Sequence, residues 1–357
     1  MNIGILTFHQ YDNYGAVLQA YAMMKTLHKI GHQCEIIDLR RRPRNRFVSD
    51  VYERVFNRNF YLFREEYLNP RTGVYYADDD LCVLNKEFDC FLVGSDQVWR
   101  PELTQERVLR YFLDFADENV LKISYAASFG TSTWRGDPEL TENVSSLLRG
   151  FDAISVREKS GVSICRDIFG VDATHVLDPA LLLTESEYAV PLKDIYMELP
   201  QHYGVSFFMD SDSDVFESVI TELLHSLRGI PVVSLSVPQI RFRGKAYHFG
   251  PRPVMDWLYA LRHSEIIVTE SFHCVAIAVV FGKKFICVVN RRRGKARLDS
   301  FLSMLGLSDF LVERDQCTKE RFSSLLSKEI DWSNVISVLR ANRERSVEFL
   351  HRVLAHG

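Results

Sequence analysis

The chain has 357 residues, which is too long for one ordinary hydrophobic core and favours two domains. Hydrophobic residues make up 46% and charged residues 25%, a balance that argues against a disordered or fibrous protein. The formal net charge is −4, whereas nucleic-acid-binding proteins are normally basic, so we expect no nucleic-acid partner.

The first half of the chain alternates predicted strands and helices. Residues 3–8 form a short apolar run, the apolar spacing over residues 17–27 is typical of a helix, and residues 34–39 are apolar again. A strand, a helix and a second strand in this order predict a parallel sheet. The alternation continues with strands at 90–95, 122–128, 153–157 and 175–177 and helices at 140–148 and 158–169.

Residues 177–191 have no clean periodicity, and we interpret them as the crossover between two domains. A second alternating series follows, with strands at 203–209, 230–237, 265–271 and 284–290 and helices at 215–227, 254–261 and 273–281. The tail, residues 332–354, has the apolar spacing of a long amphipathic helix. The sequence therefore predicts an α/β fold with two doubly wound, Rossmann-like domains and a C-terminal helix.

The cysteine usage and the N-terminal sequence predict a cytoplasmic protein. The seven cysteines form no CxxC pair, and the N-terminus lacks the pattern of a signal peptide. The longest apolar run, residues 274–281, is far shorter than the roughly 20 residues that a membrane span needs. We predict no metal and no cofactor. P-loop, zincin and GxSxG patterns are also missing from the sequence.

Active sites in parallel sheets lie beyond the carboxyl ends of the strands, and between two domains this rule predicts a site in the cleft. Asn13 and Gly15 follow the first strand, where backbone N–H groups would bind an anion. The alternative is a plain turn. Ser95, Asp96 and Gln97 follow the strand at 90–95, and Asp96 would orient or deprotonate a hydroxyl. The alternative is a helix N-cap.

Two further positions follow predicted strands. Arg157 has the guanidinium that suits bidentate binding of a carboxylate or phosphate, and the alternative is an ion pair with Glu158 or Asp152. His273 opens an apolar helix and would serve as a general acid or base. The alternative for His273 is a hydrogen-bonded core residue.

Several segments together resemble the polysaccharide pyruvyl transferase family. They are residues 13–22, 88–99, 123–130, 154–161, 176–183 and 269–286, with a terminal helix at 330–350. The most specific parts are GSDQVW at 94–99 and SFH at 271–273. The resemblance implies a GT-B-like fold. Residues 1–184, with the C-terminal helix 333–357 returning to them, would form the acceptor side, and residues 185–332 the donor side.

The resemblance also implies a reaction. The pyruvyl group of phosphoenolpyruvate becomes a ketal on two hydroxyls of a sugar, in a surface polysaccharide or its precursor, and phosphate is released. His273 matches the functional histidine of the family and Asp96 would assist it as a catalytic residue, while Arg157 matches an arginine for the carboxylate or phosphate of the donor. The other predicted substrate-binding residues are Asn13, Gly15, Ser95, Gln97, Ser271, Arg243 and Arg293.

This chain departs from many relatives at Ser271, where they carry arginine, so another cation must neutralise the donor. Arg243, Lys245 and Arg293 are the candidates. The basic runs at 39–46 and 290–297 are solvated loops, or they contact phosphates or an anionic membrane surface. The first run would touch the membrane face, or the pyrophosphate of a polyprenyl-linked acceptor. A nucleotide-sugar glycosyltransferase and a non-catalytic carbohydrate-binding protein remain as alternative functions.

Overall fold

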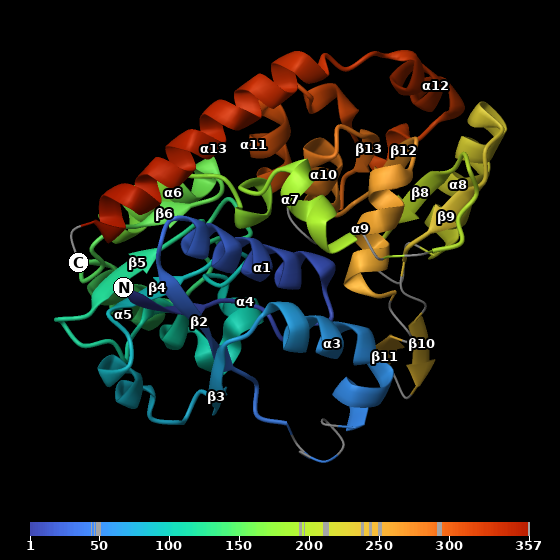
Figure 1. The fold of residues 1–357 in the computed structure, drawn as a ribbon. Coiled ribbons are helices and arrows are strands. Elements are labelled where there is room, and N and C mark those ends of the chain that lie inside the picture. Colours follow the sequence, from blue (N-terminus) through green and yellow to red (C-terminus); the bar gives the residue numbers. More distant parts are fainter. Residues whose placement is uncertain are drawn as a thin grey trace. The chain divides into compact units, whose positions relative to one another are not determined.

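A computed structural model describes residues 1–43, 45, 47, 51–192, 195, 197–209, 214–236, 239–242, 245–248, 252–290 and 295–355. The chain divides into two compact units, which Figure 1 shows in the colours of the sequence. Unit 1 comprises Met1–Arg44, Arg64–Leu182 and Leu339–Gly357, and unit 2 comprises Asn45–Phe63 and Leu183–Val338.

Unit 1 is built on a five-stranded parallel sheet in the order β3-β2-β1-β4-β5. Its strands are β1 (Asn2–Leu6), β2 (Gln33–Leu39), β3 (Arg71–Tyr75), β4 (Cys90–Val93) and β5 (Leu121–Ser124). The main helices of this part of the chain are α1 (Tyr14–Lys29), α3 (Arg58–Tyr67), α4 (Pro101–Thr104), α5 (Pro138–Leu148) and α6 (Lys159–Phe169). The central strands β1 and β4 are almost wholly apolar and buried, as expected for a parallel sheet covered on both faces.

A short parallel pair, β6 (Ser155–Val156) and β7 (Thr174–His175), continues this sheet beyond β5. Single bridges join Ile123 to Ala153 and Ala127 to Val156. The predicted strand at 122–128 ends at Ser124, because Ala126 takes a φ of +56° and interrupts the ladder. Because β6 continues the sheet, Arg157, which follows β6, lies at the same carboxyl edge of the sheet as the loop after β4.

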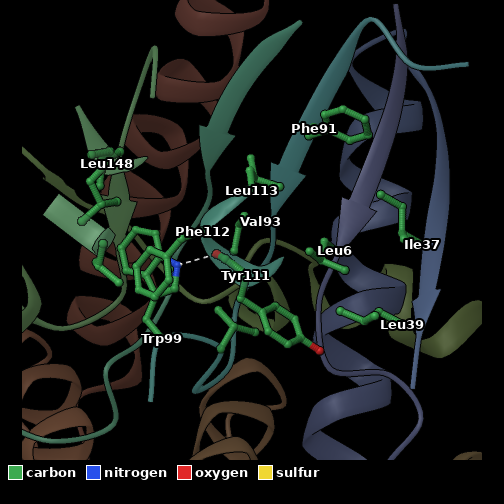
Figure 2. Close-up of a cluster of buried hydrophobic side chains, with 14 of the residues drawn as sticks. Leu6, Ile37, Leu39, Phe91, Val93, Trp99, Tyr111, Phe112, Leu113 and Leu148 are labelled. Carbon is green, nitrogen blue, oxygen red and sulfur yellow. Dashed lines mark hydrogen bonds between the residues drawn. The ribbon is translucent and has the colours of Figure 1, made fainter. Parts of the chain in front are cut away.

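Aromatic rings fill the core beneath that edge. Trp99 stacks on Phe112 with ring centroids 5.2 Å apart, and its Nε1 donates to the backbone oxygen of Tyr111 at 2.8 Å (Figure 2). All of these side chains are fully buried. The packing anchors the segment that follows β4 and so fixes the end of the turn that carries the predicted site residues.

The last part of helix α13 (Trp332–Leu354) belongs to unit 1. The Ser346 hydroxyl accepts a hydrogen bond from the backbone N–H of Leu177 at 3.0 Å, and the ring of Phe349 lies 6.3 Å from that of Tyr125. These contacts confirm the predicted return of the C-terminal helix to the first half of the chain.

Unit 2 contains a second five-stranded parallel sheet, in the order β14-β13-β12-β8-β9. Its strands are β8 (Gly204–Phe207), β9 (Val232–Ser234), β12 (Ile266–Thr269), β13 (Lys284–Val288) and β14 (Leu311–Val312). The accompanying helices are α7 (Glu185–Ala189), α8 (Asp214–Arg228), α9 (Val254–His263), α10 (Phe272–Val280), α11 (Ala296–Met304) and α12 (Lys319–Ser327), and a hairpin pairs β10 (Gln239–Phe242) with β11 (Lys245–His248).

The two parallel sheets with their helices confirm the predicted α/β fold class. Helix α10 is buried from Phe272 to Val279 and is apolar except at His273, so it forms part of the core of unit 2. Within the described segments, no helix combines the length and the apolar character that crossing a bilayer requires.

Candidate functional site

The turn after β4 carries Ser95, Asp96 and Gln97. A Cβ on Gly94 would lie 2.8 Å from the Cβ of Thr7, so only glycine permits this close approach to the end of β1. The Thr7 hydroxyl then donates to the backbone oxygen of Ser95 at 2.7 Å. The turn is therefore held against the segment that follows β1, and its backbone is fixed before any substrate arrives.

Asp96 adopts a φ of +77°, which lies in the left-handed region that non-glycine residues rarely enter. Its carboxylate accepts a hydrogen bond from the N–H of Gln97 at 2.9 Å, and its backbone oxygen accepts one from the N–H of Ser128 at 3.0 Å. The side chain keeps 13% of its surface exposed. Strained backbone of this kind concentrates at functional sites, and here it presents a carboxylate that solvent can still reach.

Arg157 lies beside Asp96 with its guanidinium fully buried. Its Nη2 donates to Asp96 at 3.0 Å, and its Nη1 donates to the carboxylate of Asp178 at 2.6 Å. Burial alone would lower the pKa of Arg157, but the charges of Asp178 and Asp96 raise it above its usual value. The guanidinium thus stays charged and holds Asp96 in place. Direct binding of a donor anion by Arg157 stays a prediction.

Sequence reasoning missed Asp178, the second partner of Arg157. Its fully buried carboxylate accepts hydrogen bonds from the Ser95 hydroxyl at 2.8 Å and from the N–H of Ala180 at 3.0 Å. The signal for it in the sequence was an aspartate between Leu177 and Pro179 in an otherwise apolar run. Since Asp178 links Ser95 to Arg157, and Arg157 contacts Asp96, these three predicted residues form one network with Asp178.

Glu158 extends the network behind Arg157. Its carboxylate accepts hydrogen bonds from the Ser128 hydroxyl and from the N–H of Phe129, both at 2.9 Å. It also lies 3.9 Å from the Nε of Arg157. The alternative of an ion pair with Glu158 therefore describes part of the geometry of Arg157, but the pair is buried and not on the surface.

The other predicted residues of unit 1 have structural partners. Asn13 is the N-cap of α1, and its side-chain oxygen accepts from the N–H groups of Gly15 at 2.8 Å and Ala16 at 3.3 Å. The Gln97 amide oxygen accepts from Arg100 at 2.8 Å. These contacts account for Asn13, Gly15 and Gln97 through local structure, and their binding of substrate stays a prediction.

His9 and Asp38 form a buried pair at the carboxyl ends of β1 and β2 that sequence reasoning did not single out. The two ring nitrogens of His9 lie 3.1 Å from the Thr7 carbonyl oxygen and 3.1 Å from the Asp38 carboxylate. Both neighbours offer hydrogen-bond acceptor oxygens to the ring. Arg40 adds a bidentate contact to Asp38 at 2.7 and 2.8 Å.

We expect the protonation of Asp38 to make unit 1 less stable at acidic pH than at neutral pH. Burial would raise the pKa of Asp38, but hydrogen bonds from His9 and Arg40 hold the pKa far below its usual value. A carboxyl with a depressed folded-state pKa stabilises the protein above the unfolded-state pKa of about 4, and this contribution is lost as the pH falls further. Asp38→Asn should therefore cost about 1.5–3 kcal/mol at neutral pH.

Urea unfolding between acidic and neutral pH measures this effect, with the exposed Asp117→Asn as the control. The difference between Asp38→Asn and the natural chain should shrink as the solution becomes more acidic than about pH 4. An equal difference at every pH would show that charge on Asp38 contributes nothing.

In unit 2, the loop after β12 positions Ser271 and His273. The Thr269 hydroxyl donates to the Phe207 carbonyl at 2.7 Å and accepts from the N–H of Ser271 at 3.1 Å. Ser271 is the N-cap of α10, and its hydroxyl accepts from the N–H of Cys274 at 3.5 Å. The predicted strand at 265–271 ends early, at Thr269, because the chain turns here to begin this helix.

Glu270 joins three loops at the same edge of the sheet in unit 2, and sequence reasoning did not select it. Its buried carboxylate accepts from the N–H of Met209 and the amide of Asn290, both at 2.9 Å, and from Arg314 at 3.2 Å. Met209 follows β8 and Asn290 follows β13. Glu270 therefore fixes the loops around the start of α10.

His273 is the second residue of α10 and is 7% exposed. Its ring meets the ring of Phe272 edge-on at 5.2 Å, and the guanidinium of Arg297 lies 5.7 Å from the centre of the Phe272 ring. A histidine and a cation thus flank one aromatic side chain at the N-terminus of a helix. Two of the predicted donor cations, Arg243 and Arg293, lie outside the described residues.

A hollow of about 600 Å³ opens at the amino-terminal edge of the sheet in unit 1, away from these loops. The carboxylates of Asp89, Glu118 and Asp152 line it, together with Met1, Asn119, Val120 and Leu121. Because its charged side chains are acidic, the hollow does not suit an anionic donor.

The model of the polysaccharide pyruvyl transferase family matches residues 13–292. This range is more than half of the chain and holds all of the predicted site residues except Arg293. None of the curated proteins compared with this chain matches it.

Solved structures show the same fold at low sequence identity. UDP-GlcNAc 2-epimerase from Methanocaldococcus jannaschii superposes with a TM-score of 0.59 at 12% identity, and 100% of each chain is covered. A putative UDP-N-acetylglucosamine 2-epimerase from Listeria monocytogenes gives 0.58 at 12% identity, covering 99% of this chain and 96% of that one. UGT89C1 of Arabidopsis thaliana, complexed with UDP-L-rhamnose, gives 0.53 at 9% identity and covers 98% of both chains. These likenesses confirm the GT-B-like fold.

Proposed function

The chain belongs to the polysaccharide pyruvyl transferase family, and we propose that it moves the pyruvyl group of phosphoenolpyruvate onto two hydroxyls of a sugar. The match over residues 13–292 carries this proposal. The buried network around Asp96 and the position of His273 supply groups suited to the chemistry. The sugar would belong to a surface polysaccharide or to its lipid-linked precursor.

The overall reaction needs an acid, a base and a leaving phosphate. Protonation of C3 of phosphoenolpyruvate makes C2 electrophilic, and one sugar hydroxyl adds to C2 as it loses its proton. The bond between C2 and the phosphate oxygen then breaks, and the second hydroxyl adds to C2 and loses its own proton. The products are one pyruvate ketal and one inorganic phosphate, with no change in redox state.

His273 is our choice for the group that protonates C3, since a histidine exchanges protons near neutral pH. Asp96 is our choice for the carboxylate that orients or deprotonates a sugar hydroxyl. Its carboxylate is partly exposed, and Arg157 holds it at 3.0 Å. Arg297, beside Phe272, offers a cation for the donor in place of the arginine that Ser271 replaces.

Incubation of the chain with phosphoenolpyruvate and a panel of glycosides tests the function. We expect one glycoside to gain the mass of pyruvate less one water, and one phosphate to be released for each ketal formed. Panel members whose paired hydroxyls are methylated serve as controls and should not react. Consumption of a nucleotide sugar without phosphate release from phosphoenolpyruvate would instead indicate a glycosyltransferase. Sugar binding without any turnover would indicate a carbohydrate-binding protein.

A further inference from the structure

Arg107, which none of the steps above uses, is a buried cation in unit 1. Its side chain is fully buried, and its hydrogen bond runs from Nη2 to the Tyr11 hydroxyl at 2.8 Å. Its Nε and Nη1 are buried without a hydrogen-bond partner among the described residues. The adjacent Glu106 lies 3.5 Å from Arg41 instead. In the described part of the chain, no carboxylate forms an ion pair with Arg107.

Two tyrosine hydroxyls accompany Arg107. Tyr111 is fully buried and its hydroxyl has no partner among the described residues, while Tyr11 is partly exposed. Both rings meet Phe8 edge-on, at 5.1 Å for Tyr11 and 5.4 Å for Tyr111. Burial raises the pKa of Tyr111, so it is a neutral phenol that can donate a hydrogen bond.

The polar groups of this cluster are nearly all donors. Arg107 offers its Nε and Nη1 protons, and Tyr111 offers its hydroxyl proton. The Tyr11 oxygen already accepts from Arg107, so its own proton is also available. Water could satisfy these donors, but it would leave the buried guanidinium without a counter-charge in direct contact, which is costly. A charged acceptor with several oxygens satisfies both requirements.

The cluster lies on the same carboxyl edge of the sheet as Asp96. Tyr11 follows β1, and Arg107 belongs to the segment that follows β4. Figure 2 shows the Tyr111 hydroxyl on the side of Leu6 and Leu39, the last residues of β1 and β2, and away from Trp99. Besides burial, the charge of Arg107, which lowers the pKa of Tyr111, and the charges of Asp38 and Asp96, which raise it, act on this hydroxyl.

We propose that Arg107, Tyr11 and Tyr111 form a binding subsite for a phosphoryl group, reached past the partly exposed Tyr11. A phosphoryl group has the negative charge and the several acceptor oxygens that this cluster lacks. The identity of the ligand rests on the proposed function, in which either phosphoenolpyruvate or a phosphorylated sugar acceptor would supply the group. Phosphate binding itself does not depend on pyruvyl transfer.

Calorimetric titration of the full chain tests the subsite. Inorganic phosphate should bind, and glucose 1-phosphate and phosphoenolpyruvate identify the source of the group. Arg107→Gln should weaken phosphate binding by about tenfold or more, the loss that goes with a charge-assisted hydrogen bond. Tyr111→Phe should weaken it less, because it keeps the ring and removes one donor. The exposed Arg135→Gln, whose arginine pairs with Glu102, should bind as the natural chain does.

The outcomes separate the possibilities. If Arg107→Gln selectively weakens binding of glucose 1-phosphate, the subsite holds the acceptor, and if it weakens binding of phosphoenolpyruvate, the subsite holds the donor. Equal phosphate affinity in the natural chain and in both variants would overturn the proposal, as would a natural chain that binds no phosphate at millimolar concentration. Should Arg107→Gln fail to fold, the comparison with Tyr111→Phe decides. Because no turnover is measured, failure of the proposed function would leave these results unaffected.

Discussion

Replacing His273 by alanine is expected to slow pyruvyl transfer by about 10²–10⁴-fold, the range that general acid–base catalysis contributes. The reason is that C3 of phosphoenolpyruvate must gain a proton before C2 becomes electrophilic. His273 stands at the start of α10, where the Ser271 cap and the Glu270 contacts fix the backbone. The measurement is the initial rate of phosphate release in the presence of phosphoenolpyruvate and an acceptor.

The matched control is His263→Ala, which removes an exposed histidine at the end of α9 in the same unit. Its rate should equal that of the natural chain. The pH profile of kcat/KM for His273→Ala should also lose one of its ionisations. If His273→Ala kept full activity and full stability, the histidine would be neither the acid nor a necessary core residue.

The sequence located the loops of the candidate site because strands in parallel sheets bury apolar runs that are easy to recognise. The residues after such runs, such as Asp96 and His273, lie at carboxyl edges by topology alone. Helix starts were equally visible, since Asn13 and Ser271 are good N-caps that precede apolar helices. These local patterns were enough to predict which side chains to inspect.

The partners of those residues escaped prediction because they are distant in sequence. Ser95 and Asp178 are separated by 83 positions, and only the folded chain brings them to 2.8 Å. A buried Glu270 or Arg107 is equally invisible, because burial of a charge depends on tertiary packing and has no local pattern. We expected Arg157 to bind a donor anion, but Asp178 and Asp96 contact its guanidinium, and the sequence does not show these contacts.

The fold itself escaped prediction where strands lack a buried apolar run. Strand β3, Arg71–Tyr75, is only half-buried, so it lacks the apolar run that marks a central strand. The hairpin of β10 and β11 consists of short strands outside the parallel alternation. A pattern of buried apolar residues therefore finds the apolar strands of both sheets and misses β3 and the hairpin.

Replacing Arg157 by methionine is expected to destabilise the chain by about 3–5 kcal/mol, the cost of breaking a buried ion pair from one side. The carboxylate of Asp178 is fully buried, and its Oδ2 lies 2.6 Å from the guanidinium, so the variant leaves a buried charge without its counter-charge. Such a loss is a large fraction of the 5–15 kcal/mol that typically stabilises a protein. Urea unfolding at neutral pH measures it.

The double variant Arg157→Met with Asp178→Asn separates stability from chemistry. The asparagine oxygen can still accept from the N–H of Ala180, its Nδ2 can donate to the Ser95 hydroxyl oxygen, and it carries no charge, so most of the lost stability should return. Activity should remain low, since Asp96 has lost the guanidinium that holds it at 3.0 Å. Recovery of both stability and activity would mean that Arg157 serves only the fold, and that Asp96 needs no cation to act.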